Sequence, residues 1–593
     1  MASLINRILK PAKLVVDDIS VSVGQVIASI SEQIRKISRV FVIPSKGGKF
    51  ATLVKNEILN RINLNEAQIH DIVSKISHRN EEPPKSWKKI KFKGILIANR
   101  GEIALRVIRA CRELGIKAYI VYTTHDKDSL AVKHADKAYC IGKSGIAYLN
   151  IRKIVGIAKR AKVEAIHPGY GFLSENPKFA RLCEQNGLKF IGPSSSLITV
   201  FGDKVKAREL MAKVGIPIIG GTKRILIDVN DAINIAGKLG YPVILKAGSG
   251  GGGKGVRIVN NESEMPSAYE SAQKEAVASF GDNGLYIEKY IVDPRHIEFQ
   301  ILADRYGNII HLGERECSIQ RRYQKLIEES PSIAITPEIR EKMGAIAVRI
   351  ARMINYEGAG TVEFLLDKNN NFYFIEMNKR IQVEHGITEI VTGVDIVKQQ
   401  IRIAAGARLS YTQEDIKITG YAIECRINAE CPREEFCPSV GTITKYLPPG
   451  GPGIRVCSSC HAGQVVSPQY DSLLAKLMCS GKNRREAIVR MRRALDEYVI
   501  DGVDTTIDFH KVIFRERDFV KGIINTNFIE KHNLIEKICK AKKENTEISK
   551  NEKMLIISTA VTKYMELKGT NPNTNNRVSP WIMAGRQEVM NEG

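Results

Sequence analysis

The chain has 593 residues, too many for one hydrophobic core, and typical domain sizes predict about three to five folding units. Its composition, 43% hydrophobic and 26% charged, is ordinary for a soluble globular protein. No run approaches the roughly 18 apolar residues of a membrane span, and the first residues lack the apolar centre of a secretory signal. We therefore expect a cytoplasmic protein without a membrane span, with targeting to an organelle as the weaker alternative.

The formal net charge of +24 raises nucleic acid as a partner, because basic surfaces bind phosphate backbones. No aromatic-interleaved basic stripe and no zinc-finger spacing accompanies the charge. We expect no nucleic-acid partner and interpret the excess as a solvated surface that also suits polyanionic substrates.

Eleven cysteines, an odd number, argue for a reducing compartment. Five of them lie between Cys425 and Cys460 and end in a C-x-x-C that His461 follows. A zinc site would need three or four of these side chains to converge. We favour buried or incidental thiols, and the sequence leaves a zinc site within Cys431 to Cys460 open.

Residues 1–93 have a pattern of their own. Apolar residues recur every three or four positions in parts of residues 1–80, which predicts helices, but the repeat is too short for a coiled coil. The charged, Pro-containing segment His78–Lys93 is typical of a linker. We expect a helical extension and linker, which is either a small helical domain or a docking arm for another subunit.

A different pattern begins at Gly94. The apolar run Ile95–Ala98 precedes a helical pattern over Ile103–Leu114, and further apolar runs follow at Ala118–Tyr122 and Val163–Ile166. Alternating strand and helix signals predict a parallel α/β unit. No G-x-G-x-x-G follows the first strand, which argues against a dinucleotide site.

A glycine run, Gly248–Gly255, follows the strand-like segment Tyr241–Lys246 and precedes a second one, Val256–Val259. Glycine lets backbone N–H groups approach phosphate oxygens, and the adjacent lysines supply positive charge. The run is not a Walker A loop, because Lys254 is followed by glycine rather than Ser or Thr. We interpret it as a hairpin lid over a phosphate group, with a mobile linker as the alternative.

Polar and cationic groups then follow on successive segments, Leu285–Tyr290, Pro294–Glu298 and Gln320–Lys325. A nucleotide pocket that holds a triphosphate requires such groups in such an order.

The segment Thr361–His385 is the most informative in the chain. Two strand-like runs, Thr361–Leu366 and Phe372–Asn378, flank a polar turn in which Asn369-Asn370 suits positive φ. Counting outward from this pair gives the expected register: Leu366 opposite Tyr373, Phe364 opposite Ile375, and Glu363 opposite Glu376.

The facing carboxylates of Glu363 and Glu376 would repel each other. A hard divalent cation between them removes this cost, because Mg²⁺ prefers carboxylate oxygens. Alternation continues the polar row through Asn378 and Arg380 and directs the remaining side chains to the core. These core-directed residues are Tyr373, Ile375 and Met377.

From Lys93 to about Lys531 the chain resembles biotin carboxylase, the ATP-grasp component of acetyl-CoA, propionyl-CoA and pyruvate carboxylases. The strings that carry the resemblance occur in the family's order: IANRGEIA, HPGYGFLSEN, GGGGKG, EKY with PRHIE, ECSIQRR, FIEMN with RIQVEH, and ECRINAE.

The resemblance implies an α/β and α+β multidomain fold. The expected parts are the helical extension and linker at 1–93, a parallel α/β domain at 94–205, an ATP-grasp domain at 206–410 with its lid at about 219–291, a C-terminal biotin carboxylase domain at 411–534, and an accessory tail at 535–593 for subunit docking.

The implied reaction starts when MgATP phosphorylates bicarbonate to carboxyphosphate. This releases CO₂ beside the ureido nitrogen of biotin, phosphate accepts the proton of that nitrogen, and biotin attacks CO₂. The cofactors are Mg²⁺ or Mn²⁺ and biotin on a carrier, with ATP as substrate. Acetyl-CoA is the expected final acceptor, with pyruvate or propionyl-CoA carboxylase as alternatives.

The resemblance assigns roles residue by residue. The metal ligands would be Glu363, Glu376 and Asn378. The ATP-binding residues would be Lys204, Lys246, Gly250, Gly251, Gly252, Gly253, Glu288, Lys289, Ile291, His296 and Gln320. The catalytic residues would be Glu384 as the base for bicarbonate, Lys325 at the transferring phosphoryl, Arg380 at the anion and Arg426 at the biotin enolate oxygen. Bicarbonate and biotin would be held by Arg380, Gln382, the Val383 amide and Arg426.

Several positions depart from the family pattern. Tyr323 stands where relatives usually have His or Asn, Lys379 replaces a small residue, Gly386 replaces a proline, and Gly248 replaces a serine. The expected metal, phosphate and base residues are all present, so we expect activity, while affinity and rate stay open.

The sequence lacks an A-M-K-M biotinylation site and leaves no region for a carboxyltransferase. We therefore expect a homodimer that acts with a separate biotin carboxyl carrier protein and separate carboxyltransferase subunits. Two other interpretations stay open, namely another ATP-grasp ligase, and a nucleotide-binding scaffold whose departures have silenced catalysis.

Overall fold

The computed structural model describes residues 92–200, 202, 204–222, 224–248, 255–540, 554 and 557–559. The predictions for residues 1–91 and for the glycines at 250–253 lie outside these residues. The chain divides into two compact units, Met1–Asn533 and Leu534–Gly593. Among the described residues, no helix is both long and apolar enough to cross a membrane.

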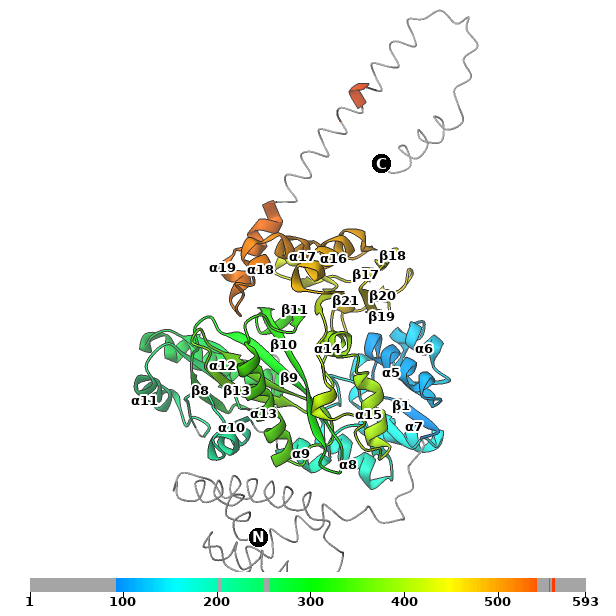
Figure 1. The fold of residues 1–593 in the computed structure, drawn as a ribbon, viewed down its shortest axis with the longest axis horizontal. Helices are drawn as coiled ribbons and strands as arrows, with labels where there is room; N and C mark the ends of the chain where they lie inside the picture. Colours follow the sequence, from blue (N-terminus) through cyan, green and yellow to red (C-terminus); the bar gives the residue numbers. More distant parts are fainter. Residues whose placement is uncertain are drawn as a thin grey trace, which may run out of the picture. The chain divides into compact units, whose positions relative to one another are not determined.

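The first described part is a five-stranded parallel sheet with strand order β3-β2-β1-β4-β5 (Figure 1). Along its central strand, Ile95 and Ile97 belong to one apolar core, whereas Leu96 and Ala98 belong to another. A sheet that is buried on both faces requires a continuous apolar run, which is the pattern of the sequence here. The predicted parallel α/β unit is confirmed.

The strands of this sheet are β1 (Gly94–Ile97), β2 (Lys117–Thr123), β3 (Lys137–Gly142), β4 (Ala165–His167) and β5 (Lys189–Phe190). The accompanying helices are α5 (Gly101–Glu113), α6 (Leu130–His134), α7 (Ile151–Ala161), α8 (Pro177–Gln185) and α9 (Ser195–Val200), with 3₁₀ turns at Thr124–Asp126 and Gly145–Leu149.

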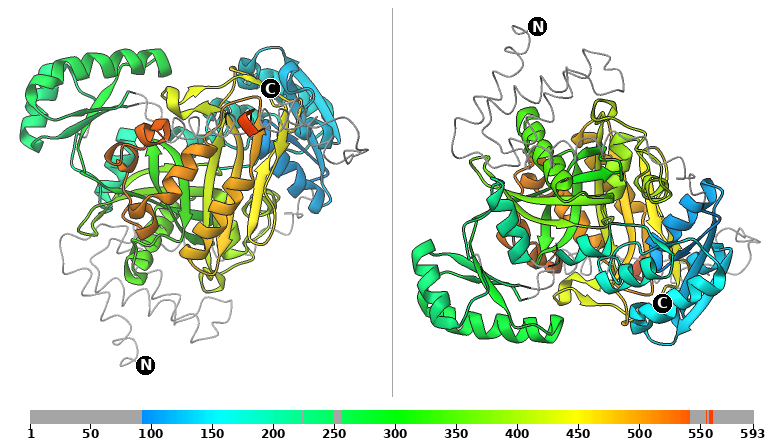
Figure 2. Two further views of the ribbon diagram at one scale, coloured as in Figure 1. Left: turned by 90° about the horizontal axis from the view of Figure 1, so that it is seen from above. Right: turned by 90° about the horizontal axis from the view of Figure 1, so that it is seen from below.

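A second, three-stranded antiparallel sheet has the order β7-β6-β8 (Figure 2). Its strands are β6 (Val243–Ala247), β7 (Arg257–Val259) and β8 (Leu285–Lys289), and it packs against helices α11 (Val229–Leu239) and α12 (Met265–Phe280). A 3₁₀ turn at Glu262–Glu264 precedes α12, whereas helix α10 (Lys204–Lys213) contributes Ala207 and Met211 to the core of the largest sheet. The predicted hairpin on either side of the glycine run is confirmed by the pairing of β6 with β7.

The largest sheet is antiparallel and has the order β13-β12-β9-β10-β11-β14-β21-β19 (Figure 1). On its strand β9, Ile297, Phe299 and Ile301 enter an apolar core that helix α13 also joins. The alternate residues of β9 are polar, and Glu298 and Gln300 have no exposed surface. This buried polar face carries the candidate site.

The strands of the largest sheet are β9 (Arg295–Ala303), β10 (Ile309–Arg321), β11 (Gln324–Ser330), β12 (Gly358–Leu366), β13 (Phe372–Asn378), β14 (Tyr421–Asn428), β19 (Ile454–Ser458) and β21 (Leu473–Gly481). Its helices are α13 (Pro337–Met353), α14 (His385–Thr392), α15 (Ile396–Ala404) and α16 (Arg484–Glu497). The domain boundary that we predict at residue 410 falls between α15 and β14, and β14 pairs with β11, so the sheet runs on across this boundary.

The remaining elements of the first unit are short. They are α17 (Ile507–Arg515), α18 (Arg517–Lys521), α19 (Phe528–Lys531), the strand pairs β15 (Glu430–Cys431) with β16 (Cys437–Pro438), β17 (Gly441–Thr442) with β20 (Val465–Val466), and β18 (Lys445–Leu447) with β22 (Val499–Asp501), and 3₁₀ turns at Gln413–Asp415 and Pro432–Glu434. In the second unit, Lys540 forms an ion pair of 2.7 Å with Glu536.

The predicted hairpin is present, and Glu363 lies opposite Glu376 as counted. Nearer the turn the predicted register is wrong, because Phe364 pairs with Phe374, and Leu366 with Phe372. A β-bulge leaves Ile375 as an extra residue, and such a bulge reverses the alternation of side chains.

Because of the bulge, the prediction that Ile375 on β13 points to the core is also wrong. Phe374 joins the apolar core together with Met377, whereas Ile375 lines a cavity beside Glu376. Of the two turn asparagines, Asn370 has the positive φ, at 62°. The Asp367 carboxylate accepts the backbone N–H groups of Asn369 and Asn371, so the turn is a five-residue loop closed by a side chain.

Candidate active site

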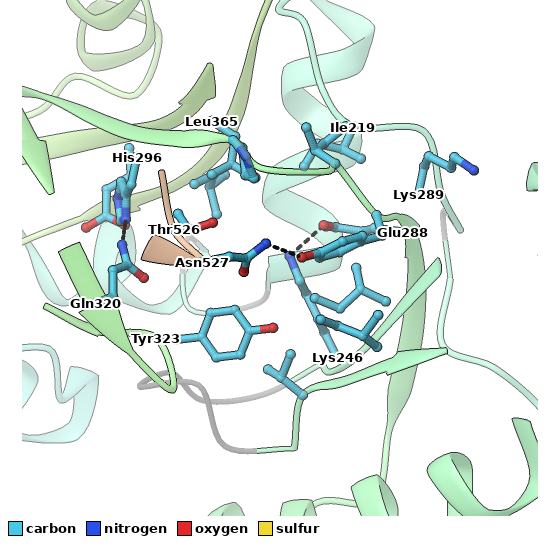
Figure 3. Close-up of a pocket in the computed structure, with 18 of the residues that line it drawn as sticks. Ile219, Lys246, Glu288, Lys289, His296, Gln320, Tyr323, Leu365, Thr526 and Asn527 are labelled. Carbon is cyan, nitrogen blue, oxygen red and sulfur yellow. Dashed lines mark hydrogen bonds and ion pairs between the residues drawn. The ribbon is translucent and has the colours of Figure 1, made fainter. Parts of the chain in front are cut away.

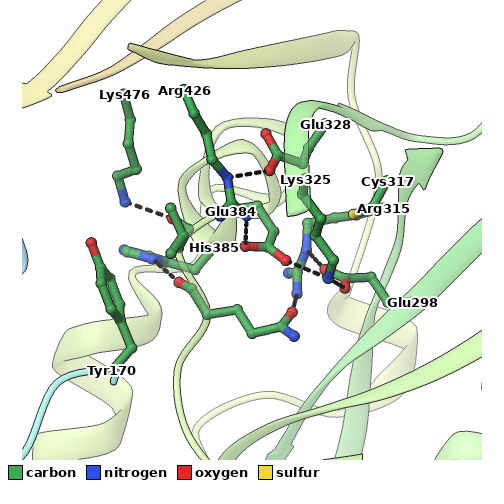
Figure 4. Close-up of polar contacts among 12 residues, drawn as sticks. Tyr170, Glu298, Arg315, Cys317, Lys325, Glu328, Glu384, His385, Arg426 and Lys476 are labelled. Carbon is green, nitrogen blue, oxygen red and sulfur yellow. Dashed lines mark hydrogen bonds and ion pairs between the residues drawn. The ribbon is translucent and has the colours of Figure 1, made fainter. Parts of the chain in front are cut away.

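Lys325, near the start of β11, lies among three buried carboxylates (Figure 4). Its Nζ donates to Glu298, to Glu363 at 3.0 Å and to Glu384 at 2.8 Å. Burial opposes the charge of Lys325, but the three carboxylates outweigh it and raise the pKa of this ammonium well above its usual value. Lys325 therefore stays charged in the interior.

Glu384 directly precedes helix α14 and is 2% exposed. Besides Lys325, it accepts a hydrogen bond from Arg426 Nη2 at 2.9 Å, and Arg426 Nε donates to Glu328 at 2.6 Å. Burial alone would raise the pKa of Glu384, but Lys325, Arg426 and Arg315 hold it well below the usual range. The expected base is thus anionic and oriented by two cations.

Arg315 is a fully buried cation that the sequence reasoning missed. Its guanidinium donates to Glu298, to Gln300 at 2.8 Å and to Gln382 at 3.0 Å, and also to hydroxyls on β12 and α14. This one side chain of β10 therefore connects β9, β12 and α14. No local motif marks it, because its partners are distant in sequence.

The Glu363 carboxylate accepts hydrogen bonds from several side chains. Its Oε1 accepts from Asn378 Nδ2 at 2.8 Å and from Gln382 Nε2 at 2.7 Å, as well as from Lys325. His296 Nε2 lies 3.0 Å from Oε2. Burial raises the pKa of Glu363, but Lys325 and His296 hold it well below its usual value. The carboxylate is anionic, as it must be to bind a divalent cation.

Arg380 and Lys379 share one carboxylate that the sequence reasoning did not single out. Glu175, from the HPGYGFLSEN string, accepts from Arg380 Nε at 2.9 Å and from the Lys379 backbone N–H at 3.1 Å. Arg380 Nη2 also donates to Asn378 at 3.1 Å. Lys379 is 6% exposed and its Nζ lies 3.6 Å from Glu175, so this departure from the family pattern is a buried cation beside the expected anion site.

A cavity of about 430 Å³ opens next to this cluster (Figure 3). The structure brings together around it eight of the residues assigned to ATP or metal: Lys246, Glu288, Lys289, Ile291, His296, Gln320, Glu363 and Glu376. Of the other ATP-binding candidates, Gly250 to Gly253 and the side chain of Lys204 lie outside the described residues.

Lys246 and Glu288, which border the cavity, are paired with each other. Lys246 Nζ donates to Glu288 at 2.6 Å, and Arg208 forms a second ion pair with Glu288. Lys289 donates to the carbonyls of Gly240 and Tyr241 at 2.8 and 3.1 Å, and its ammonium points away from the cavity (Figure 3). Of the two neighbouring ATP-binding candidates Glu288 and Lys289, only Glu288 directs its charged group towards the cavity.

Tyr323, the second departure, also lines the cavity. It occupies the two-residue turn between β10 and β11 with Arg322, and both residues have positive φ, at 65° and 48°. Thr526, Asn527 and Glu530 line the same cavity from a segment about 200 residues away, and no sequence signal identified them.

The third departure, Gly386 in α14, has a packing reason. A Cβ at this position would lie 2.5 Å from Met478 Sδ and 3.2 Å from its Cε. The side chain of Met478, on β21, therefore occupies the space that a larger residue would need.

The cysteine cluster does not form a metal centre among the described residues. The groups there that could hold a metal are His296, Glu298 and Glu363, and Glu298, Cys317 and Glu384. All eleven cysteines are free, and Cys431 pairs across strands with Cys437. Of the five clustered thiols, those of Cys425, Cys431, Cys457 and Cys460 are buried and that of Cys437 is exposed.

Glu424 is a buried carboxyl that faces Glu328 across β11 and β14. Within the described part of the chain, neither of its oxygens has a hydrogen-bond partner. Burial raises the pKa of Glu424 well above its usual value, Lys476 counteracts this only in part, and Glu328 adds to it. Burial likewise raises the pKa of Glu328, to about 7. Repulsion between the two carboxyls adds to burial and favours a proton on Glu424.

Comparison with known proteins gives a consistent result. Three family models match: "Biotin carboxylase, N-terminal domain" at 91–198, "Carbamoyl-phosphate synthase L chain, ATP binding domain" at 203–412, and "Biotin carboxylase C-terminal domain" at 424–531.

Relatives are similar over almost their whole length. Biotin carboxylase 1 of Bacillus subtilis is 54% identical, over 75% of this chain and 99% of that protein. One pyruvate carboxylase subunit, from Methanothermobacter thermautotrophicus, is 53% identical, over 80% of this chain and 99% of that protein. The biotin carboxylase domain dimer of Hydrogenobacter thermophilus 2-oxoglutarate carboxylase, solved with MgADP and bicarbonate, has a TM-score of 0.74 and 54% identity, and covers 75% of this chain and 98% of that one.

Gly386→Ala is predicted to lower the free energy of unfolding by about 1–2 kcal/mol, because the overpacking against Met478 exceeds the gain in helix propensity. Chemical denaturation measures the change. Met478→Val should relieve the clash, so the double variant loses less than the sum of the single changes.

Gly237→Ala in α11 is the matched control, since nothing lies within 4 Å of its added Cβ. We expect it to be neutral or slightly stabilising. Additive losses at Gly386 and Met478 would refute the packing explanation.

Glu424→Gln is predicted to become more favourable relative to the wild type as pH rises. The folded state keeps a proton on Glu424 that the unfolded chain releases above its ordinary pKa, so this group's contribution falls as pH rises towards the folded pKa. The difference in unfolding free energy between variant and wild type should grow by up to about 1.4 kcal/mol per pH unit from pH 5 towards 7.

Denaturation at several pH values measures this difference. Glu497→Gln removes the same formal charge from a side chain that is 44% exposed, and serves as the control. A difference for Glu424→Gln that is constant with pH would show that Glu424 is ionised in the fold.

Proposed function

The chain belongs to the biotin carboxylase family, and we propose that it carboxylates biotin on a separate carrier protein with ATP and bicarbonate. It is an ATP-dependent ligase of the ATP-grasp type, and biotin carboxylation is the first half-reaction of a biotin-dependent carboxylase. The observation that carries the proposal is the position of Lys325, which connects the expected base Glu384 with Glu363 at the edge of the cavity.

We assign the cavity to ATP. Lys246 on β6, Glu288 and Ile291 at the end of β8, and His296 and Gln320 on the large sheet all border it. Gln320 Nε2 donates to His296 Nδ1 at 2.8 Å, which leaves the other ring nitrogen as the donor towards Glu363. This pair therefore joins the nucleotide cavity to the carboxylate cluster. The glycine run between β6 and β7 would cover the phosphates with backbone N–H groups.

The residues present fit a hard divalent cation. Glu363 and Glu376 face each other on neighbouring strands, and Asn378 adds an amide oxygen that accepts a hydrogen bond from Arg380. An ion would take these carboxylate and amide oxygens in exchange for their present donors. We propose these three as ligands of Mg²⁺ or Mn²⁺. When bound, the ion would neutralise charge on the phosphate oxygens during transfer.

Glu384 is proposed as the base that takes the proton of bicarbonate. Its pKa is held low, which keeps it ionised, and its position beside Lys325 places a cation where negative charge moves from bicarbonate to the phosphoryl group. Bicarbonate oxygen would attack the terminal phosphorus and ADP would leave, which gives carboxyphosphate. Arg380, Gln382 and the Val383 amide are proposed to hold the anion.

Carboxyphosphate then breaks down to CO₂ and phosphate. Phosphate takes the proton of the ureido nitrogen, and that nitrogen attacks CO₂. Arg426 is proposed to stabilise the enolate oxygen of biotin, because its guanidinium lies on the cluster and is fixed by Glu328 and Glu384.

Acetyl-CoA is our proposed final acceptor, with pyruvate or propionyl-CoA as the alternatives. The relatives include a pyruvate carboxylase subunit and add 2-oxoglutarate to these alternatives. We propose separate carrier and carboxyltransferase subunits, together with a homodimer, which is the state named for the H. thermophilus domain. The free state of all eleven cysteines supports a reducing, cytoplasmic location.

Glu384→Ala is predicted to abolish bicarbonate-dependent ATP hydrolysis in the presence of free biotin, because removal of the base leaves the bicarbonate proton in place. Phosphate release measures the rate, and calorimetry with MgATP should give a Kd close to the wild-type value. If Glu384→Ala hydrolysed ATP at the wild-type rate, Glu384 could not be the base that deprotonates bicarbonate.

Glu376→Gln is the matched control for this experiment. It should raise the Mg²⁺ concentration required for half-maximal rate and recover activity at high Mg²⁺, whereas Glu384→Ala should not. Tight MgATP binding by the wild type with no turnover, even with a biotinylated carrier, would instead favour a nucleotide-binding scaffold.

The choice of acceptor is predicted to follow the transferase and not this chain, because the residues that we assign serve only ATP, bicarbonate and biotin. The transferase that copurifies with the chain should pass labelled carboxyl groups to acetyl-CoA in preference to propionyl-CoA, pyruvate and 2-oxoglutarate. Label transfer measures the preference, and preferential labelling of a keto acid would exclude acetyl-CoA.

A further inference from the structure

Two backbone carbonyls immediately before the proposed base are each held by a buried side chain (Figure 4). The Gln382 carbonyl lies 2.7 Å from His385 Nδ1. The Val383 carbonyl accepts a hydrogen bond of 2.6 Å from Lys476 Nζ on β21. Both peptide groups that flank Val383 are thus fixed by side chains.

The bond to Gln382 defines the state of His385. A carbonyl only accepts, so Nδ1 carries the proton. Burial, with the nearby cations Lys476, Arg106 and Arg455, lowers the pKa of His385 well below its usual value, so the ring is neutral.

Lys476 has no exposed surface. Its Nζ lies 3.1 Å from Glu102 Oε1, at the start of α5, and Glu102 also accepts from the hydroxyl of Tyr170. Burial opposes the charge of Lys476, but the Glu102 carboxylate outweighs it and raises the pKa of this ammonium. The side chain is therefore a buried ammonium.

A buried charge is expensive, and an apolar residue of similar size is often at least as stabilising. A function beyond packing would explain why a cation occupies this position. The only backbone group that Lys476 binds in the described residues is the carbonyl next to Glu384.

We propose that Lys476 is a positioning residue for the reaction, an inference that rests on the proposed function. Its bond to the Val383 carbonyl fixes the peptide that enters Glu384, and so keeps the Glu384 carboxylate between Lys325 and Arg426. The His385 bond fixes the preceding peptide, whose N–H belongs to Val383 and points opposite to the Gln382 carbonyl because the peptide is planar and trans. Lys476 and His385 together orient both the base and the anion-binding amide.

The action of Lys476 is geometric and not electrostatic. The cations that lower the pKa of Glu384 are Lys325, Arg426 and Arg315. The charge of Lys476 is balanced instead by Glu102, whose Oε1 lies 3.1 Å from Nζ. Removal of Lys476 should therefore loosen the base without greatly changing its ionisation.

Lys476→Met is the test, because methionine keeps most of the volume and removes the donor. We expect kcat/KM for bicarbonate to fall roughly 10- to 100-fold, the scale of a misplaced catalytic group. The Kd for MgATP should stay within about twofold of the wild type, because neither Lys476 nor its partners line the cavity. The acid limb of the pH–rate profile should keep its midpoint. If Lys476 only stabilised the fold, its loss would not lower kcat/KM for bicarbonate while leaving the MgATP Kd and the acid midpoint unchanged.

Met478→Leu is the matched control, since Met478 is equally buried on the same face of β21 and provides no hydrogen bond to the loop before α14. It should retain kcat/KM for bicarbonate. Glu102→Gln is a milder second variant in case Lys476→Met does not fold, because it weakens the anchor of Lys476 and leaves the ammonium in place. It should lower kcat/KM for bicarbonate several-fold with an unchanged MgATP Kd.

Wild-type kcat/KM for bicarbonate in Lys476→Met, or in Glu102→Gln where the first variant does not fold, would overturn the proposal. An equal loss in Met478→Leu would also overturn it, since packing would then explain the effect. Failure of the proposed function gives a different result, namely no bicarbonate-dependent ATP hydrolysis by the wild-type chain.

Discussion

The buried contact between Lys325 and three carboxylates is the constraint on which the site depends. Carboxylates at such close range in an interior of low dielectric repel one another strongly, and each has lost its hydration. Lys325 touches all three, while Arg315 and Arg426 each bind one of them from another side. Three cations thus balance three anions: Lys325, Arg315 and Arg426 against Glu298, Glu363 and Glu384.

The architecture supplies these groups from distant parts of the chain. Glu298, Arg315, Lys325, Glu363 and Arg426 lie on five strands of one continuous antiparallel sheet, and Glu384 enters from the loop before α14. Rigid strands hold charged groups more accurately than loops, which a catalytic constellation requires. The small sheet of β6, β7 and β8 contributes Lys246 and Glu288 to the cavity edge. The parallel α/β part contributes Glu102 from the start of α5, and Tyr170 and Glu175 from the loop after β4.

Sequence reasoning succeeded where the signal was local. The parallel sheet followed from a short apolar run, and the opposition of Glu363 and Glu376 followed from counting residues across a turn. It failed at the bulge, because a one-residue insertion has no signature of its own, and Ile375 and Phe374 exchanged faces in consequence. Arg315 and Glu175 could not be found, since their partners lie 15 to 205 residues away and only the fold unites them. Gly386 could be noticed as unusual, but its reason lies in Met478 on another strand.

The pairing of the cations also bears on how the site discriminates among anions. Lys246 is bound to Glu288, Arg380 to Glu175, and Lys325 to three carboxylates, so each of these three cations already has an intramolecular partner. An anion that engages one of them must compete with a carboxylate that is held in place by the fold. A single weakly placed charge gains little from such an exchange, whereas a polyphosphate that brings its own divalent cation also changes the balance at Glu363 and Glu376. In the nucleotide cavity, the ion pair of Lys246 with Glu288 therefore favours a metal–polyphosphate over a simple anion.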